Sequence, residues 1–199
     1  MEINFSPNKI EFEKELNKLD ILALEFSQIL NKLNINYIIF SGYVAILFGR
    51  SRSSEDIDLL LEKISSSKFN ELWKELSAGF ECLNTSIVEE AYNNYLASNI
   101  PLRFAKPNTF EPNIEIKFPK TELDLYSLDK KIEISLNNNK FYTSPLELQI
   151  SFKLFLGSEK DIEDAKFLYN IFKDKINISL LNEFNRKLKV IELFNNYLK

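Results

Sequence analysis

The stretch of sequence that decides the fold is Phe40–Leu61, which reads FSGYVAILFGRSRSSEDIDLLL. Its second half has the apolar character of a buried strand, and side chains two apart on a strand leave the same face. Asp56 and Asp58 therefore share a face, with their Cα atoms about 7 Å apart at a rise of about 3.3 Å per residue. Upstream, Ser41 and Gly42 lie between a short apolar strand and a short helix. The stretch predicts two carboxylates close to a tight turn.

These residue types suit chemistry on phosphates. Two convergent carboxylates repel each other unless a divalent cation such as Mg²⁺ or Mn²⁺ lies between them. A residue without Cβ, such as Gly42, lets the backbone approach a phosphate, and N–H groups at a helix start can hold it. An isolated Asp-x-Asp is usually only a polar strand edge. The order of the features, from strand and Ser-Gly turn to Asp-x-Asp strand, favours metal-assisted phosphoryl or nucleotidyl transfer.

Composition excludes several other classes of site. The 199 residues are 45% hydrophobic and 27% charged, which is typical of a globular protein. The net charge of −4 argues against a nucleic-acid coat protein but leaves room for a local basic groove. The chain has no histidine, which excludes Ser–His–Asp triads and His-ligated metals, and Cys82 is its single cysteine, which excludes an internal disulfide. Any chemistry must use carboxylates, lysines, hydroxyls and bound metal.

Patterning predicts an α+β (α/β) chain in two parts. Residues 1–143 are expected to form an α/β domain with a long N-terminal helix and a small mixed sheet flanked by helices. Residues 144–199 are expected to form a helical domain, because Ser144-Pro145-Leu146-Glu147 has the signature of a helix start. The expected helices are residues 8–33, 43–48, 65–77, 86–98, 145–156, 161–173 and 179–196, and the expected strands are 37–40, 56–62, 102–105, 114–118, 131–136 and 140–142.

The segment resembles the first motif of the nucleotidyltransferase superfamily with the DNA polymerase β-type palm. More narrowly, it is similar to the AbiEii-like minimal nucleotidyltransferases, the toxin family of abortive-infection and type IV toxin–antitoxin systems. Their typical Gly-Gly-x-Ala, then Gly-x-x-Arg-x-Thr-x-Asp-Ile-Asp, corresponds here to Ser41-Gly42-Tyr43-Val44, then Gly49, Arg52, Ser54, Asp56 and Asp58. Ser41 is the departure that matters, because its side chain could obstruct a phosphate or donate its hydroxyl to one.

A second segment, Asn113–Phe118 (NIEIKF), resembles the family's strand that ends in Glu-x-Lys. Period 2 places Glu115 and Lys117 on one face. If this strand lies beside the Asp-x-Asp strand, Glu115 is the third carboxylate of the metal site and Lys117 contacts a triphosphate. The alternative is a surface Glu/Lys pair on an edge strand.

A third segment resembles the family's helical region, in which a Lys is followed by Lys/Arg-Asp-x-x-Asp. The corresponding residues are Lys153, Lys160, Asp161 and Asp164. Lys153 lies in an apolar run, so its ammonium needs an anionic partner or a solvent-filled cleft. The resemblance implies that Lys153 and Asp161 belong to the nucleotide site. Asp161 could instead cap the next helix.

The resemblance implies a metal-dependent nucleotidyltransferase (EC 2.7.7 type) that binds an NTP. Ser41, Gly42, Arg52, Lys117 and Lys153 would hold the nucleotide. Asp56, Asp58 and Glu115 would bind Mg²⁺ or Mn²⁺ and carry catalysis. The acceptor would be an RNA such as a tRNA, or a protein hydroxyl, and an antitoxin protein is an expected partner.

The sequence is also compatible with two other functions. One is a nucleotide- or partner-binding module of the same fold without turnover, and the other is a phosphotransferase that moves the γ-phosphate. We expect a cytoplasmic location and no membrane partner, because there is no signal peptide and no apolar run long enough to span a bilayer.

Overall fold

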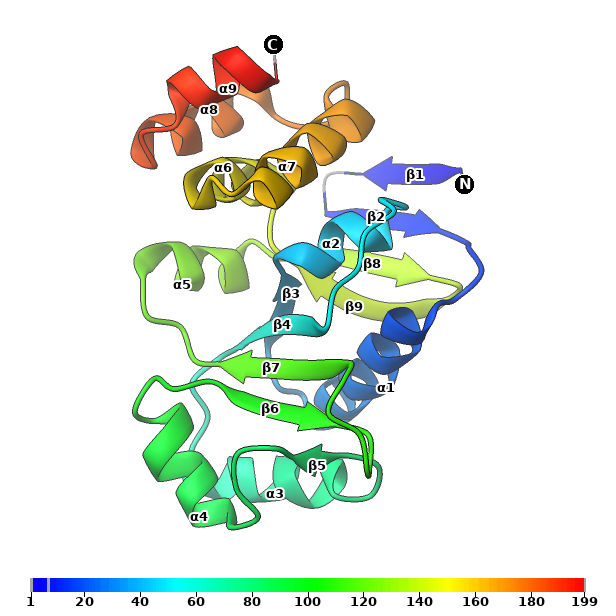
Figure 1. Cartoon of the computed structure of the whole chain (residues 1–199), viewed down its shortest axis with the longest axis vertical. Coiled ribbons are helices and arrows are strands. Elements are labelled where there is room, and N and C mark those ends of the chain that lie inside the picture. The colour runs from blue at the N-terminus through cyan, green and yellow to red at the C-terminus, as the bar shows by residue number, and fades with distance from the viewer. Residues whose placement is uncertain (1, 7, 199) are drawn as a thin grey trace.

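A computed structural model describes residues 2–6 and 8–198 of the chain. Its centre is a nine-stranded mixed sheet in the order β1-β2-β8-β9-β3-β4-β7-β6-β5 (Figure 1). The mixed α/β fold class is confirmed, but the sheet is larger than expected. The strands are β1 (Ile3–Ser6), β2 (Lys9–Phe12), β3 (Tyr37–Phe40), β4 (Asp56–Leu61), β5 (Glu81–Cys82), β6 (Leu102–Ala105), β7 (Asn113–Lys117), β8 (Ile132–Leu136) and β9 (Asn139–Thr143).

Helices cover both faces of the sheet and gather at one end of the molecule, where α6 to α9 lie together (Figure 1). In the described part of the chain no helix is long and apolar enough to cross a membrane. The helices are α1 (Lys18–Lys32), α2 (Gly42–Leu47), α3 (Ser66–Leu76), α4 (Val88–Glu90), the π-helical segment η1 (Ala91–Leu96), α5 (Glu122–Asp129), α6 (Leu146–Leu156), α7 (Glu159–Phe172), α8 (Ile178–Lys187) and α9 (Ile191–Tyr197).

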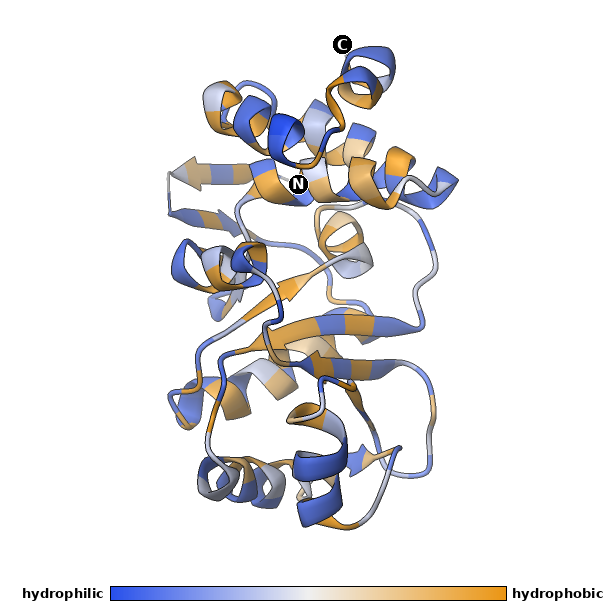
Figure 2. Ribbon diagram, turned by 90° about the vertical axis from the view of Figure 1, so that its left-hand side faces the viewer, coloured by the Kyte–Doolittle hydropathy of each residue, from blue (hydrophilic) through white to orange (hydrophobic). Residues whose placement is uncertain are grey.

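The three central strands separate a core face from a site face. β3 runs antiparallel to β4, and β4 runs parallel to β7. Ile57 and Leu59 of β4 are fully buried in the main core, which also includes residues of α1 and α3. On the other face, Leu60 joins a small cluster with Leu128 of α5. Apolar residues accordingly gather on the inner strands and on the inward sides of the helices (Figure 2).

The C-terminal helices pack against the α/β part. Phe48, which follows α2, stacks edge-on against Phe172 of α7, with their ring centroids 4.8 Å apart. Both residues are buried in the main hydrophobic core. The division of the chain at residue 143 stays a prediction, and the structure adds that the two parts share apolar contacts at the C-terminal end of α2.

The prediction of one helix over residues 8–33 was wrong. Residues 9–12 form β2, whose alternating burial places Ile10 and Phe12 inward, and α1 begins only at Lys18. The helix begins there because Asn17 and Asp20 form a capping box, in which each side chain accepts a hydrogen bond from the other residue's backbone N–H. The strands β1 and β2 enlarge the sheet beyond the small one expected.

Two other expected helices have different forms. The expected helix over residues 179–196 is two helices, because Lys189 has a left-handed φ of 59° between α8 and α9. The expected helix over residues 86–98 is the short α4 followed by η1. The helix α5 was not predicted, although Thr121 and Asp124 form a capping box at its start. The strands expected at 37–40 and 102–105 are confirmed at those bounds.

Candidate active site

Strand register brings the predicted acidic residues together on the site face. Asp58 on β4 pairs with Glu115 on β7, and Leu60 pairs with Lys117 one pleat further along. Paired residues on adjacent strands point to the same side of a sheet. Asp56, Asp58, Glu115 and Lys117 therefore share one face. β7 lies between β4 and β6, so the alternative of a Glu/Lys pair on an edge strand is wrong.

The Asp58 carboxyl is the most perturbed acid of this face. Its pKa is raised from 3.8 to about 6, mainly by burial and then by the negative charge of Asp56, with a smaller contribution from Glu115; Lys117 and the Ser41 hydroxyl act in the opposite direction. Ionising both aspartates without a cation is therefore costly. A perturbed acid beside a second carboxylate is typical of functional sites.

Ser41 lies at the turn that brings α2 beside the carboxylates. Its φ of 69° and ψ of −140° are in a region that favours glycine, which is the residue expected at this position from the resemblance. Its side chain makes no cap hydrogen bond to α2, and its hydroxyl is close enough to Asp58 to lower the pKa of that carboxyl. The sequence left two roles open for this hydroxyl, obstructing a phosphate or donating to one. Its effect on the Asp58 carboxyl is a third.

Gly42 makes room for an arginine. A Cβ on Gly42 would lie 3.0 Å from one guanidinium nitrogen of Arg52, so any side chain here would displace that group. The Arg52 guanidinium also donates to the Asp164 carboxylate at 2.6 Å. The structure therefore places Arg52 against the Ser41-Gly42 turn, as expected of a phosphate contact, and anchors it to α7.

Of the two surroundings expected for the Lys153 ammonium, an anionic partner or a solvent-filled cleft, the structure shows the first. Its ammonium lies 2.7 Å from Asp161 Oδ1 and 2.8 Å from Asp164 Oδ2, and its side chain is only 3% exposed. Arg50 also pairs with Asp164, which is fully buried. One carboxylate on α7 thus joins three cations, Lys153 from α6 and both arginines from the loop between α2 and β4. We call Arg50, Arg52, Lys153, Asp161 and Asp164 the Asp164 network.

Asp161 is the third residue of α7, and the cap is Ser158, whose hydroxyl accepts from the Asp161 backbone N–H. The alternative in which Asp161 caps the helix is therefore wrong. Burial raises the pKa of the Asp161 carboxyl, but the hydrogen bonds from Lys153 and Ser158 outweigh it and lower the pKa below 3.8. Asp161 is thus ionised and holds Lys153 in place.

Glu115 has a partner that sequence reasoning missed. Its carboxylate accepts from Arg103 Nε at 3.1 Å, and Arg103 is its neighbour on β6. The Arg103 side chain is 56% exposed, whereas that of Glu115 is 15% exposed. The alternation of β6 places Arg103 on the site face, but only the register with β7 reveals the pair.

The aspartate pair has the chemistry that a hard divalent cation requires. Mg²⁺ and Mn²⁺ prefer carboxylate oxygens, and the mutual repulsion that raises the Asp58 pKa is relieved by a bound cation. Over residues 2–6 and 8–198, no three acidic, Cys or His side chains are grouped closely enough to hold a metal ion. The expected three-carboxylate group of Asp56, Asp58 and Glu115 is therefore not assembled here, and the Glu115 carboxylate is paired with Arg103. The oxygen donors of Asp56 and Asp58 fit a hard divalent cation by their chemistry.

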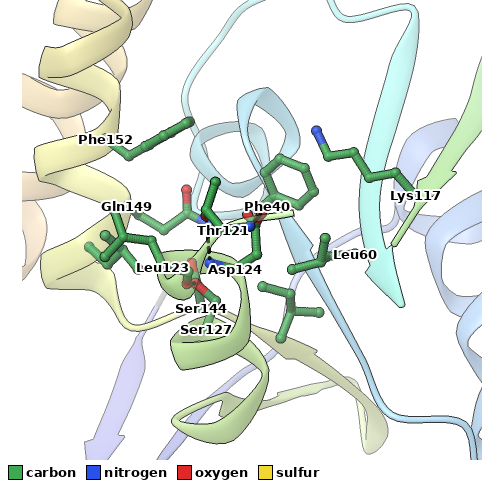
Figure 3. A pocket seen from close by; sticks show the side chains of 12 residues that line it. Phe40, Leu60, Lys117, Thr121, Leu123, Asp124, Ser127, Ser144, Gln149 and Phe152 are labelled. Carbon is green, nitrogen blue, oxygen red and sulfur yellow. Dashed lines mark hydrogen bonds between the residues drawn. The ribbon is translucent and has the colours of Figure 1, made fainter. Parts of the chain in front are cut away.

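A small cavity extends the site face beyond the carboxylates (Figure 3). Its volume is about 90 Å³. Phe40 of β3, Leu60 of β4 and Lys117 of β7 line one side, and side chains of α5 and α6 line the other. The Lys117 ammonium lies over the Phe40 ring, 4.5 Å from its centroid. Lys117 thus lies between the cavity and the carboxylates.

Comparisons with known proteins bear on this fold. No protein-family model matches the chain, and no curated protein does. A solved structure of an antigenic nucleotidyltransferase-like protein from Paracoccidioides brasiliensis matches with a TM-score of 0.56, 17% identity, and coverage of 91% of this chain and 92% of that one. This chain has the fold of a nucleotidyltransferase-like protein. At this identity the likeness concerns the fold alone.

Other solved structures match less closely. The lincosamide antibiotic adenylyltransferase LnuA has a TM-score of 0.48 and 14% identity, with coverage of 79% of this chain and 99% of that one. A putative nucleotidyltransferase from H. pylori has a TM-score of 0.48 and 17% identity, with coverage of 90% and 83%.

Proposed function

We propose that this protein is a metal-dependent nucleotidyltransferase that moves a nucleoside monophosphate from an NTP to an acceptor hydroxyl. The observation that carries the proposal is the position of Asp56 and Asp58 on one sheet face beside the Ser41-Gly42 turn. Such a face offers oxygen ligands for a cation next to the Arg52 guanidinium, which lies against the turn. The fold is compatible with this activity.

Each site residue has a role in this proposal. Asp56 and Asp58 hold Mg²⁺ or Mn²⁺, which supplies Lewis-acid activation of the acceptor hydroxyl and neutralises the leaving pyrophosphate. Ser41 keeps the Asp58 carboxylate oriented. When its carboxylate separates from Arg103, Glu115 acts beside the acceptor hydroxyl, either as a further metal ligand or as the base that takes the hydroxyl proton.

The triphosphate binds over the turn. Gly42 leaves the space in which the Arg52 guanidinium lies, and Lys117 adds a second cation on the same face. Lys153 and Asp161 act through the Asp164 network, since Lys153 shares the Asp164 carboxylate with Arg52. They position Arg52 for the phosphates.

We extend the proposal to the AbiEii-like family on the pattern of Lys153, Asp161 and Asp164 in the helical region. In that case the acceptor is an RNA, such as a tRNA end, or a protein hydroxyl. The chain is then the toxin of a toxin–antitoxin pair, acts in the cytoplasm and has an antitoxin protein as its partner.

One observation favours a second candidate. The ion pair between Arg103 and Glu115 occupies the third carboxylate, as expected of a nucleotide-binding module that has lost turnover. Such a module would bind an NTP and form no product with any metal.

A labelling reaction tests the first candidate against the second. Each α-³²P-labelled NTP is incubated with total RNA and cell extract in Mg²⁺ or Mn²⁺, with the wild type, Asp58→Asn and the exposed control Asp129→Asn. We expect a labelled product from the wild type and the control and none from Asp58→Asn. Label that persists in Asp58→Asn contradicts the metal assignment, and NTP binding without label favours the binding module.

A further inference from the structure

The cavity beyond the carboxylates continues the site face. Leu60 and Lys117 are each two residues beyond Asp58 and Glu115 on their strands, so they point to the same side. Phe40 pairs with Asp58 from the neighbouring strand. A molecule bound at the carboxylates could therefore place one end in this cavity.

The size of the cavity limits what it can take. At about 90 Å³ it is well below the roughly 300–1,000 Å³ of pockets that enclose a whole drug-sized ligand. Its walls include the Phe40 and Phe152 rings and the Leu60 and Leu123 side chains (Figure 3). These features suit one flat aromatic base rather than a whole nucleotide.

The polar lining of the cavity includes the Lys117 ammonium and several hydroxyls, together with two side chains, Gln149 and Asp124, that each present an acceptor oxygen with no donor among the described residues. The Thr143 hydroxyl donates to the Ile39 carbonyl oxygen and so accepts from Gln149 Nε2, at 3.5 Å. This fixes the amide and leaves Gln149 Oε1 without a hydrogen-bond partner among the residues that the structure describes. The Gln149 residue is only 4% exposed, so its amide is well shielded from bulk water.

Asp124 adds a second acceptor. One of its oxygens, Oδ2, accepts from the backbone N–H groups of Lys120 and Thr121, which fixes the carboxylate at the start of α5. Within residues 2–6 and 8–198 no donor contacts its other oxygen. In base recognition, amides such as that of Gln pair with adenine, and carboxylates accept from the cytosine amino group.

We infer that this cavity is a ring subsite that selects an amino-bearing ring, such as adenine or cytosine, through the acceptors of Gln149 and Asp124. A uracil ring would turn carbonyl oxygens toward these acceptors and lose its hydrogen bonds. The inference rests on the proposed function, in which the ring is the base of the NTP or belongs to the acceptor.

Binding of unmodified and modified nucleotides tests the inference. Equilibrium binding to the full chain in Mg²⁺ is measured for ATP, CTP, UTP and purine riboside triphosphate, which is ATP without its amino group. We expect ATP or CTP to bind about tenfold more tightly than UTP, the effect of about one net buried hydrogen bond, and purine riboside triphosphate to bind like UTP. Gln149→Met should reduce the preference to below about threefold, and the exposed control Gln28→Met should keep it.

The outcomes separate this inference from the proposed function. Equal binding of all four nucleotides overturns the base subsite while the nucleotidyltransferase proposal stands. Failure of every NTP to bind overturns the proposed function. A further measurement asks whether a free nucleoside binds when the NTP site is saturated with UTP. If adenosine or cytidine binds under these conditions and uridine does not, the ring in the cavity belongs to the acceptor. If Gln149→Met does not fold, the comparison of ATP with purine riboside triphosphate on the wild type decides alone.

Discussion

Asp58 of β4 lies opposite Glu115 of the parallel strand β7, and the two carboxylates are held by different partners. The Ser41 hydroxyl lowers the pKa of Asp58, whereas Arg103 Nε donates to Glu115 at 3.1 Å. The pair therefore has one acid that is costly to ionise and one that is already neutralised by a cation. This asymmetry leads to predictions about stability, metal affinity and turnover.

The first prediction concerns stability and pH. The pKa of Asp58 is about 6 in the folded chain and 3.8 as its ordinary value, so the folded state favours the protonated acid. Its stabilising contribution is complete below about pH 4 and is lost as the pH rises through 6. A shift of about two units corresponds to about 3 kcal/mol. Relative to wild type, Asp58→Asn should gain up to about 3 kcal/mol in free energy of unfolding between pH 4 and 7.

Urea unfolding at several pH values measures this difference, with Asp129→Asn as the exposed control. Using the difference between wild type and variant removes the contribution of other acids, such as Asp161, whose lowered pKa acts in the opposite sense. If the difference in free energy of unfolding between Asp58→Asn and wild type does not grow between pH 4 and 7, the charge on Asp58 is not costly in the folded state and the prediction is wrong.

The second prediction concerns metal binding without any reaction. A cation that binds only the folded state raises its melting temperature, so Mg²⁺ or Mn²⁺ should stabilise the wild type at pH 7.5. Asp58→Asn should lose this response because a carboxylate ligand is gone. Differential scanning fluorimetry with Ca²⁺-free buffers gives the readout. An equal rise in both proteins would indicate cation binding elsewhere on the chain.

The third prediction concerns the Arg103–Glu115 ion pair. Arg103→Gln removes the cation that competes for the Glu115 carboxylate, so Mg²⁺ should bind about three- to tenfold more tightly. Arg186→Gln, an exposed change on α8, is the matched control. The midpoint of the Mg²⁺ titration is measured for both. Unchanged or weaker Mg²⁺ binding in Arg103→Gln contradicts a competition between Arg103 and Mg²⁺ for the Glu115 carboxylate.

The fourth prediction concerns Gly42 and Arg52. Gly42→Ala introduces a Cβ 3.0 Å from the flexible end of Arg52, so the guanidinium must move while the fold stays intact. We expect NTP affinity to fall about tenfold, as for loss of one charge-assisted hydrogen bond. In Gly79→Ala the new Cβ would lie 3.9 Å from the Lys106 ammonium, an ordinary contact, so this variant should bind NTP normally. Unchanged affinity in Gly42→Ala would remove Arg52 from the phosphate site.

The fifth prediction concerns the Asp164 network. Asp164→Asn leaves Arg50, Arg52 and Lys153 without a shared carboxylate at a fully buried position. Breaking a buried ion pair from one side typically costs about 3–5 kcal/mol. We expect a loss of that size in chemical denaturation, against almost none for Asp129→Asn. A loss below about 1 kcal/mol would show that the network contributes little to the packing of α7.

The sequence predicted the central part of the site because the relevant signals are local. Alternation within β4 places Asp56 and Asp58 on one face whatever the rest of the fold, and Gly42 and the apolar run before it define the turn. The apolar surroundings of Lys153 likewise demanded an anionic partner, and Asp161 and Asp164 are close to it in sequence. These predictions needed no knowledge of the sheet order.

The features that were missed depend on contacts distant in sequence. Arg103 meets Glu115 only through the register of β6 with β7. The strand β2 pairs with β8, more than 120 residues later, and its four residues are too short to stand out from an adjoining helical pattern. The helix α5 was missed for a different reason, since its capping box was visible in the sequence but its apolar stripe is weak.

The most direct test of the central claim uses one NTP labelled at either the α- or the γ-phosphate. The wild type is incubated with each form, Mg²⁺ and cell extract, and Asp58→Asn and Asp129→Asn serve as controls. Nucleotidyl transfer predicts a product labelled from the α position only, present with wild type and Asp129→Asn and absent with Asp58→Asn. A product labelled from the γ position would identify a phosphotransferase and contradict the account.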